Sequence, residues 1–137
     1  MGQDAVIYVS DLSNAGTRNT LRPGCDKSIL HAHDDCETSV FHLAPGGGVP
    51  VHLHSRVFDL FVGVEGDIEI TYEGQQGSAV VKLKPGAFCA MPPGVRHEVR
   101  NVSATAHAKF LLVHAPNKGY DRVAVPFKNY QTAFDTT

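Results

Sequence analysis

Short runs of apolar residues alternate with turn-forming residues along most of the chain. The runs are rich in Val, Ile, Phe and Tyr and lie at 5–9, 38–43, 57–64, 67–72, 78–84, 87–91, 97–102 and 109–115. Several of them are too short for a helix of ordinary length, so the pattern predicts β-strands. In the run at 67–72, Ile68, Ile70 and Tyr72 alternate with polar residues, which is typical of a strand with one buried face.

Glycine and proline separate these runs at regular distances. The turn-forming segments lie at 45–48, 65–66, 73–77, 84–86, 92–94 and 116–119. Such spacing is typical of a sandwich or barrel of antiparallel strands, so we expect an all-β fold. The stretch VEGDIEI at 64–70 predicts a hairpin that leads into the strand at 67–72.

The two ends of the chain have a weaker pattern. Residues 11–36 contain few apolar positions and predict irregular structure or an edge strand. The tail carries four aromatic residues, Tyr120, Phe127, Tyr130 and Phe134. We expect this tail to pack on the outside of the domain or across a dimer interface. At 137 residues the chain predicts a single domain, with an N-terminal arm over about 1–36 and a C-terminal tail over about 118–137.

Composition argues against several classes of function. The formal net charge is −2 and no run of like charges occurs, so we expect no nucleic-acid partner. The sequence shows neither a long apolar stretch nor the pattern of a secretory signal, which predicts a cytoplasmic protein without a membrane partner. Three widely spaced cysteines and no CxxC pair predict free thiols instead of disulfides or a zinc ribbon.

Histidines give the main chemical signal, because the chain has eight of them. His52 and His54 are two residues apart, and on a strand their side chains share one face, as metal chelation requires. Asp59 follows five residues after His54, and His97 follows a PPG turn that would direct it back from another strand. Three imidazoles and a carboxylate suit one divalent transition-metal ion, whether Zn, Ni, Co, Fe, Mn or Cu.

Two motifs over residues 46–101 resemble those of the cupin superfamily. The first cupin motif, G-x5-HxH-x4-E-x6-G, is matched in spacing by Gly46, His52, His54, Asp59 and Gly66, with Asp in the place of Glu. The second, G-x5-PxG-x2-H-x3-N, is matched by Gly86, Pro92, Gly94, His97 and Asn101. The resemblance implies a double-stranded β-helix, or jelly-roll barrel. It also implies a metal held by His52, His54, Asp59 and His97.

The role of Asp59 has two alternatives. Asp is one methylene shorter than Glu, so Asp59 either binds the metal, directly or through water, or only orients His54 by a hydrogen bond. In the second case the site has three histidine ligands and one more open position.

Further candidates surround these ligands. Alternation places Phe61 and Gly63 on the side of Asp59, where Phe61 would be a pocket wall or ordinary core and Gly63 would leave space for substrate. His42 and His114 lie in neighbouring strands, and each is a candidate catalytic base if it points into the barrel. A second HxH pair at 31–33 lacks matching partners and predicts a solvated loop.

These features predict a stand-alone metalloenzyme that acts on a small molecule. The ion would act as a Lewis acid on a carbonyl or enol-type substrate during cyclisation, dehydration, elimination or isomerisation. One alternative is a dioxygenase that uses Fe, Mn or Cu with O₂, and another is a cupin that binds a small ligand without turnover. Sheet edges that need cover predict a homodimer.

Overall fold

The computed structural model describes residues 7–13 and 17–130, and within these ranges the chain is all-β, as predicted. The strands are β1 (Arg18–Arg22), β2 (Cys25–Ala32), β3 (Glu37–Leu43), β4 (Gly48–Leu53), β5 (Phe58–Glu65), β6 (Ile68–Gly74), β7 (Gly77–Leu83), β8 (Phe88–Met91), β9 (Arg96–Asn101), β10 (Ala108–Ala115) and β11 (Val123–Ala124). No helix in the described residues is long and apolar enough to cross a membrane.

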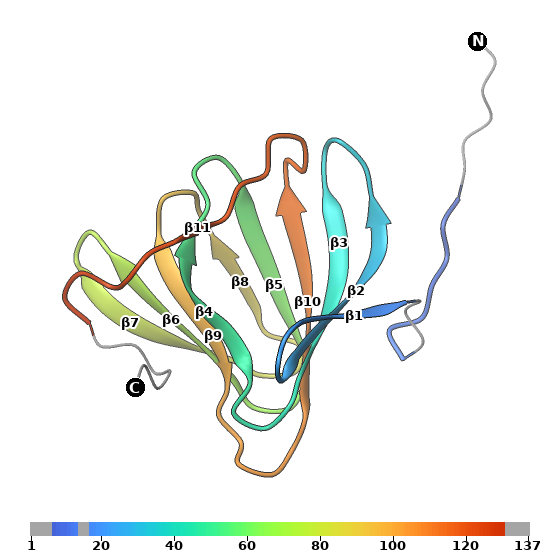
Figure 1. Cartoon of the computed structure of the whole chain (residues 1–137), viewed down its shortest axis with the longest axis horizontal. Coiled ribbons are helices and arrows are strands. Elements are labelled where there is room, and N and C mark those ends of the chain that lie inside the picture. Colours follow the sequence, from blue (N-terminus) through green and yellow to red (C-terminus); the bar gives the residue numbers. More distant parts are fainter. Residues whose placement is uncertain (1–6, 14–16, 131–137) are drawn as a thin grey trace.

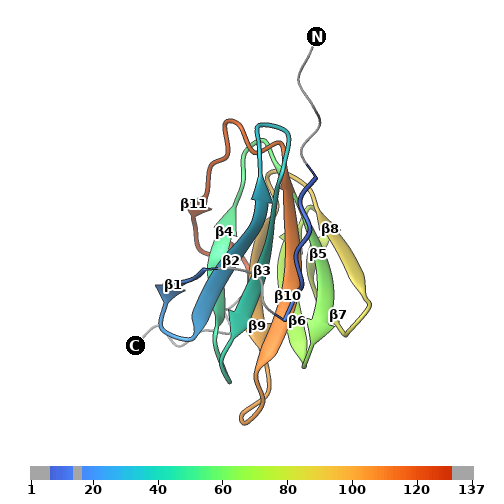
Figure 2. The ribbon, with the colours of Figure 1, turned by 90° about the vertical axis from the view of Figure 1, so that its right-hand side faces the viewer.

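Two antiparallel sheets form the predicted jelly roll. One sheet has the order β1-β2-β3-β10-β5-β8, and the other has the order β11-β4-β9-β6-β7 (Figures 1 and 2). Alternate residues of both sheets point between them, because neighbouring side chains on a strand face opposite ways. Ile68 and Ile70 of β6 are buried there, as their alternation predicted, together with Phe61 of β5 and Phe110 of β10.

The prediction of a hairpin at VEGDIEI is wrong. β5 pairs with β10 and β8, whereas β6 pairs with β7 and β9, so the turn between β5 and β6 carries the chain from one sheet to the other. Gly66 adopts a φ of 84° in this turn, and a Cβ there would press on the backbone of His107 and Ala108. Sequence alternation alone does not distinguish such a crossing from a hairpin, since both join two strands by a tight turn.

The N-terminal region forms strands at a different place from the one predicted. Residues 7–9 of the expected strand at 5–9 belong to no strand, and Ile7 and Val9 are 84% and 89% exposed. Residues 5 and 6 lie outside the described residues. β1 and β2 form an antiparallel hairpin at the edge of the six-stranded sheet instead, which agrees with the edge strand expected within 11–36.

The described part of the C-terminal tail runs along the five-stranded sheet and contributes its edge strand, β11. β11 pairs with β4, and the backbone N–H groups of Lys128 and Asn129 donate to the carboxylate of Glu73 on β6. Phe127 is buried in this segment, which Figure 1 shows in red as it crosses β4. Phe134, the last predicted packing residue, lies outside the described residues.

Candidate metal centre

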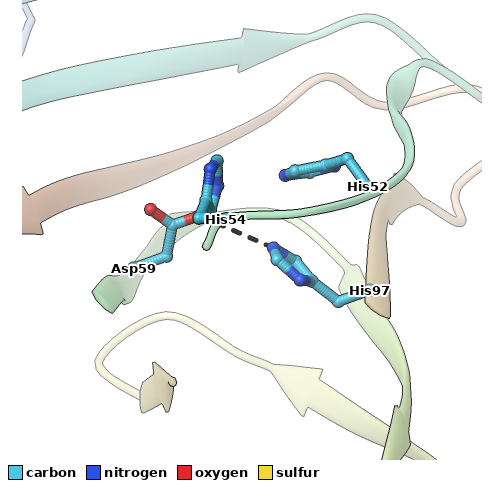
Figure 3. Close-up of side chains that lie close together, drawn as sticks. All are labelled: His52, His54, Asp59 and His97. Atoms are coloured by element: carbon cyan, nitrogen blue, oxygen red, sulfur yellow. Dashed lines mark hydrogen bonds and ion pairs between the residues drawn. The ribbon is translucent and has the colours of Figure 1, made fainter. Parts of the chain in front are cut away.

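Four buried side chains with metal-ligating atoms meet at one end of the space between the sheets. They are His52 on β4, His54 just after β4, Asp59 on β5 and His97 on β9. Their candidate ligand atoms all lie within 4.8 Å of one another. Figure 3 shows the four side chains converging, and we refer to them below as the His/Asp cluster.

Strand pairing explains how distant parts of the sequence reach this cluster. β4 and β9 are neighbours, and their register places His52 directly opposite His97. The spacing of two residues then carries His54 to the same face as His52. Asp59 comes from the other sheet, where β5 lies between β10 and β8, so the cluster joins the two sheets.

Backbone carbonyls hold all three imidazoles by the same ring nitrogen. Nδ1 of His52 lies 2.8 Å from the carbonyl oxygen of Pro50, and Nδ1 of His97 lies 2.9 Å from that of Val95. Nδ1 of His54 lies 2.6 Å from the carbonyl oxygen of Asp121 in the C-terminal tail. A carbonyl only accepts hydrogen bonds, so Nδ1 carries the proton and donates in each ring. The Nε2 atoms are thereby left to face the centre of the cluster, as in metal-binding histidines.

Asp59 couples electrostatically to two of these rings. Its Oδ2 lies 2.8 Å from Nε2 of His54 and 3.5 Å from Nε2 of His97. Burial opposes the charged form of Asp59, but its hydrogen bond with His54 and the electrostatic effect of the His54 and His97 rings outweigh burial and lower the pKa of Asp59. Burial also opposes a charged His54, yet the hydrogen bond and charge of Asp59 raise the pKa of His54. Asp59 is therefore an ionised carboxylate.

The pKa of His52 shifts in the opposite direction from that of His54. Burial, followed by electrostatic repulsion from the neighbouring His97, lowers the pKa of His52 to about 3. The ring is thus neutral over the physiological range and presents an Nε2 lone pair, which is the form that binds metal.

Two atoms of the cluster are buried without a hydrogen-bond partner, and they test whether a metal ion fits. These atoms are Oδ1 of Asp59 and Nε2 of His97. A buried polar atom without a partner costs free energy, and a cation among the four side chains would satisfy both. Three imidazole nitrogens and a carboxylate are a donor set for a divalent transition metal. The residues present therefore fit such an ion, and the His/Asp cluster is a potential metal site.

A cavity of about 290 Å³ opens beside the cluster. Part of its wall is apolar and includes the stacked rings of Phe41 and Phe110, whose centroids are 4.8 Å apart. His52, His54 and Asp59 also line it. A small molecule in the cavity would therefore contact the cluster and an apolar surface at the same time.

Comparison with known proteins agrees with this geometry. The model of the cupin domain family matches residues 39–114, which contain the whole His/Asp cluster. This chain is a cupin. A germin-like protein from Morus alba is 28% identical over 82 residues, which are 59% of this cupin and 39% of that relative. The chain thus spans about two fifths of the length of the curated relative that it matches.

Solved structures share the fold. KdgF from Halomonas sp. superposes with a TM-score of 0.69 at 17% identity, covering 83% of this chain and 96% of that one. The protein TT1209 from Thermus thermophilus gives 0.68 at 26% identity, covering 80% and 98%. A sugar phosphate isomerase from Silicibacter pomeroyi gives 0.63 at 21% identity, covering 77% and 73%. An oxalate oxidase is also among the similar structures, at 22% identity. Identities this low show a common fold and leave the reaction open.

Two sequence-based expectations about this cupin need correction. His42 lies on the outer face of β3, opposite to Phe41, and its ring approaches Ser28 instead of the cavity. Gly63 does not leave space for substrate either, because a Cβ there would clash with the backbone carbonyl of Lys84. The missing side chain makes room for the turn between β7 and β8, which hydrogen-bonds to Gly63.

The other predicted residues lie in or near the site. Phe61 is buried in the core and also lines the cavity. His114 points inward on β10 but lies behind Tyr120, whose ring stacks on it at a centroid distance of 4.2 Å. Its Nε2 is 2.9 Å from Oδ1 of Asn117. In the second HxH pair, His33 is exposed as expected, whereas His31 belongs to β2.

The sequence pattern missed a group of site residues outside the cupin motifs. Tyr120 and Arg122 of the tail, and Arg22 of β1, line the cavity, while Asp121 supplies the carbonyl that holds His54. The aromatic residues of the tail predicted that it packs against the protein, but they did not predict that it lies beside the cavity. Contacts between residues 54 and 121 depend on the path of the chain, which local patterns do not encode.

Proposed function

We propose that this cupin is a small metal-dependent enzyme that acts on a carbonyl or enol-type compound by non-oxidative chemistry. The observation that supports it is the convergence of three Nε2 atoms and an ionised carboxylate on one point beside an apolar-walled cavity. A divalent ion at that point supplies Lewis-acid polarisation of a substrate oxygen. Cyclisation, dehydration, elimination and isomerisation all draw on this chemistry.

Tyr120 is the proton-carrying residue best placed to assist. It lines the cavity and packs against His54 with ring centroids 5.0 Å apart. Burial, followed by the negative charge of Asp59, raises the pKa of Tyr120 to about 12, so its hydroxyl remains protonated at neutral pH. We assign it the role of donating a hydrogen bond, and then a proton, to the substrate. His114 and Asn117 contact Tyr120 and hold it in position.

The remaining parts of the site hold and enclose the substrate. Phe41, Phe61 and Phe110 provide an apolar surface that excludes water, which strengthens electrostatic interactions with the reacting atoms. The carbonyl of Asp121 keeps His54 in its binding tautomer. A homodimer and a cytoplasmic location stay predictions from the sequence.

Two measurements test this proposal. Metal content is determined on protein purified without added metal, and the protein is then incubated with β-diketone and β-keto acid compounds in D₂O. We expect deuterium incorporation next to the carbonyl, seen by proton NMR, with no oxygen uptake at an electrode. The exchange rate above the background measured without protein should disappear in His97→Ala. Oxygen uptake in step with substrate loss, with iron, manganese or copper bound, would show dioxygenase chemistry instead.

A matched pair of tyrosine variants tests the role of Tyr120. Tyr120→Phe keeps the ring stack on His114 and removes only the hydroxyl, so kcat should fall by about 10²-fold, the usual contribution of a general acid. Tyr130→Phe makes the same change on an exposed tail residue outside the cavity and should leave kcat unchanged. An equal kcat for Tyr120→Phe and wild type would remove Tyr120 from the mechanism.

A further inference from the structure

Two arginines from distant parts of the chain line the cavity of the His/Asp cluster. Arg22 is the last residue of β1, and Arg122 directly precedes β11. Arg22 lies in the edge strand of one sheet and Arg122 lies next to the edge strand of the other, and both residues line one cavity. Neither belongs to the cupin motifs.

Neither arginine forms an ion pair with a carboxylate among the residues that the structure describes. Other cations nearby do: Arg18 pairs with Asp26, and Lys27, which also lines the cavity, lies 2.6 Å from Glu37. The contacts of the Arg22 guanidinium are long, at 3.6 Å to Sγ of Cys25 and 3.5 Å to the carbonyl oxygen of Gly48. The cavity thus contains two positive charges that the protein leaves without a carboxylate partner.

Arg22 and Arg122 line the same cavity as His52 and His54, so their charges lie near each other and near the candidate metal centre. Burial, followed by the positive charge of Arg22, lowers the pKa of Arg122. Arg122 is exposed and Arg22 is half-buried, so a ligand can reach both side chains, and the guanidinium fork matches the geometry of carboxylate and phosphate.

We propose that Arg22 and Arg122 form an oxyanion-binding site for the substrate, so that the substrate is a small organic acid carrying a carboxylate or a phosphate group. The inference rests on the proposed function, which places the carbonyl or enol oxygen at the other end of the substrate against the His/Asp cluster. The apolar surface of Phe41 and Phe110 then contacts the carbon skeleton between the two ends. Lys27 plays a smaller part, because Glu37 already neutralises it.

Calorimetric titration with three simple probes tests the site. Benzoate and phenyl phosphate each carry an oxyanion on a flat apolar ring, and benzyl alcohol is the neutral control. We expect wild-type protein to bind at least one of the two oxyanions at least about tenfold more tightly than benzyl alcohol, since hydrogen bonds to charged groups are among the stronger ones. Whichever oxyanion binds more tightly assigns the group on the substrate as carboxylate or phosphate.

Variants then locate the bound oxyanion. Arg122→Gln and the double variant with Arg22→Gln should each weaken its binding, by about tenfold or more for the double change. Arg18→Gln is the matched control, since it makes the same substitution on β1 but outside the cavity, and its affinity should equal that of wild type. Thermal unfolding of each variant verifies that it is folded. Unchanged oxyanion affinity in the folded double variant, or equally tight binding of benzyl alcohol to wild type, would overturn the proposal.

A metal-site variant separates this inference from the proposed function. His97→Ala should lose the metal but keep most of its oxyanion affinity, because the guanidinium groups are untouched. Arginine-dependent binding by a wild-type protein that lacks turnover would support the oxyanion site while contradicting the proposed enzyme. Oxyanion binding lost in His97→Ala but unchanged in the arginine double variant would place the anion on the metal and overturn the inference.

Discussion

At the scale of single residues, the hydrogen bonds around the histidines matter as much as the histidines themselves. Each Nδ1 donates to a backbone carbonyl, and two of those carbonyls belong to residues only two positions before the histidine, Pro50 before His52 and Val95 before His97. Backbone acceptors do not depend on side-chain identity, so the ring orientations are built into the strands. Only His54 relies on a distant segment, through Asp121.

Asp59 is the residue whose role the sequence left open, and the structure brings its Oδ2 within 2.8 Å of Nε2 of His54. If its charge helps to hold the metal, Asp59→Asn, which keeps the shape and removes the charge, should weaken metal affinity by about tenfold or more. Competition with a coloured chelator measures the change. Asp67→Asn, at an exposed position, is the control and should leave the affinity unaltered. Equal affinities for both variants would mean that three histidines suffice.

Gly63 was predicted to leave space for substrate, but the structure shows that close packing requires a glycine there. Gly63→Ala places a Cβ against the carbonyl of Lys84, and backbone cannot move aside as a flexible side chain can. We expect the free energy of unfolding to fall by about 2 kcal/mol or more, measured by urea denaturation. Gly74→Ala is the control, because its Cβ would meet only ordinary contacts at 3.8 Å, and it should change stability much less.

At the scale of elements, the C-terminal segment links the outside of the barrel to its site. It contains Tyr120 and Arg122 in the cavity wall, then pairs with β4 through β11 and ends in hydrogen bonds to Glu73 on β6. The segment is therefore anchored at Glu73, which lies opposite Arg96, the residue that precedes His97. If this anchor is loosened, the carbonyl of Asp121 that holds His54 should be held less firmly, and the geometry of the site should change.

The anchor at Glu73 predicts a pH dependence. Hydrogen bonds from the N–H groups of Lys128 and Asn129 outweigh the effect of desolvation and lower the pKa of Glu73 below its ordinary value of 4.5. A lowered pKa in the folded state means that the contact stabilises the segment above about pH 4.5. This stabilisation is lost as the pH falls through the lower folded-state value. We expect hydrogen exchange at the amides of Lys128 and Asn129 to become less protected over that acid range.

The variant Glu73→Gln should remove this pH dependence, since an amide does not titrate. Glu69→Gln, on the same strand but without these contacts, should retain it. Protection of Lys128 and Asn129 that varies with pH in the same way in Glu73→Gln would exclude Glu73 as the anchor.

Strand patterns and motif spacing accounted for the fold and for the residues of the potential metal site, whereas the rest of the site depends on distant contacts. His52, His54, Asp59 and His97 carry a fixed spacing that strand geometry converts into one cluster. The crossing after β5 was taken for a hairpin because both begin with a tight turn. Tyr120 and Arg122 had no such pattern, since the contacts that bring this segment to the cluster join distant parts of the chain, as the 67-residue separation of His54 and Asp121 illustrates.

At the scale of the whole molecule, the cluster is a junction between the two sheets. His52 and His97 belong to the five-stranded sheet and Asp59 to the six-stranded sheet. An ion bound by all of them would tie the sheets together. A metal that binds only the folded state also adds its binding free energy to the stability of the fold.

Removal of the metal should therefore lower the thermal unfolding midpoint. With free metal at about 100 times its Kd, binding contributes about 2.7 kcal/mol, which corresponds to a shift of roughly 10 °C for a chain of this size. Differential scanning fluorimetry of metal-loaded and chelator-treated protein measures the shift. In His97→Ala the chelator should have no effect, because the site no longer holds metal. If the unfolding midpoint of the wild-type protein does not change with chelator, the prediction that a metal bridges the sheets is contradicted. The orphaned Oδ1 of Asp59 would then need another partner.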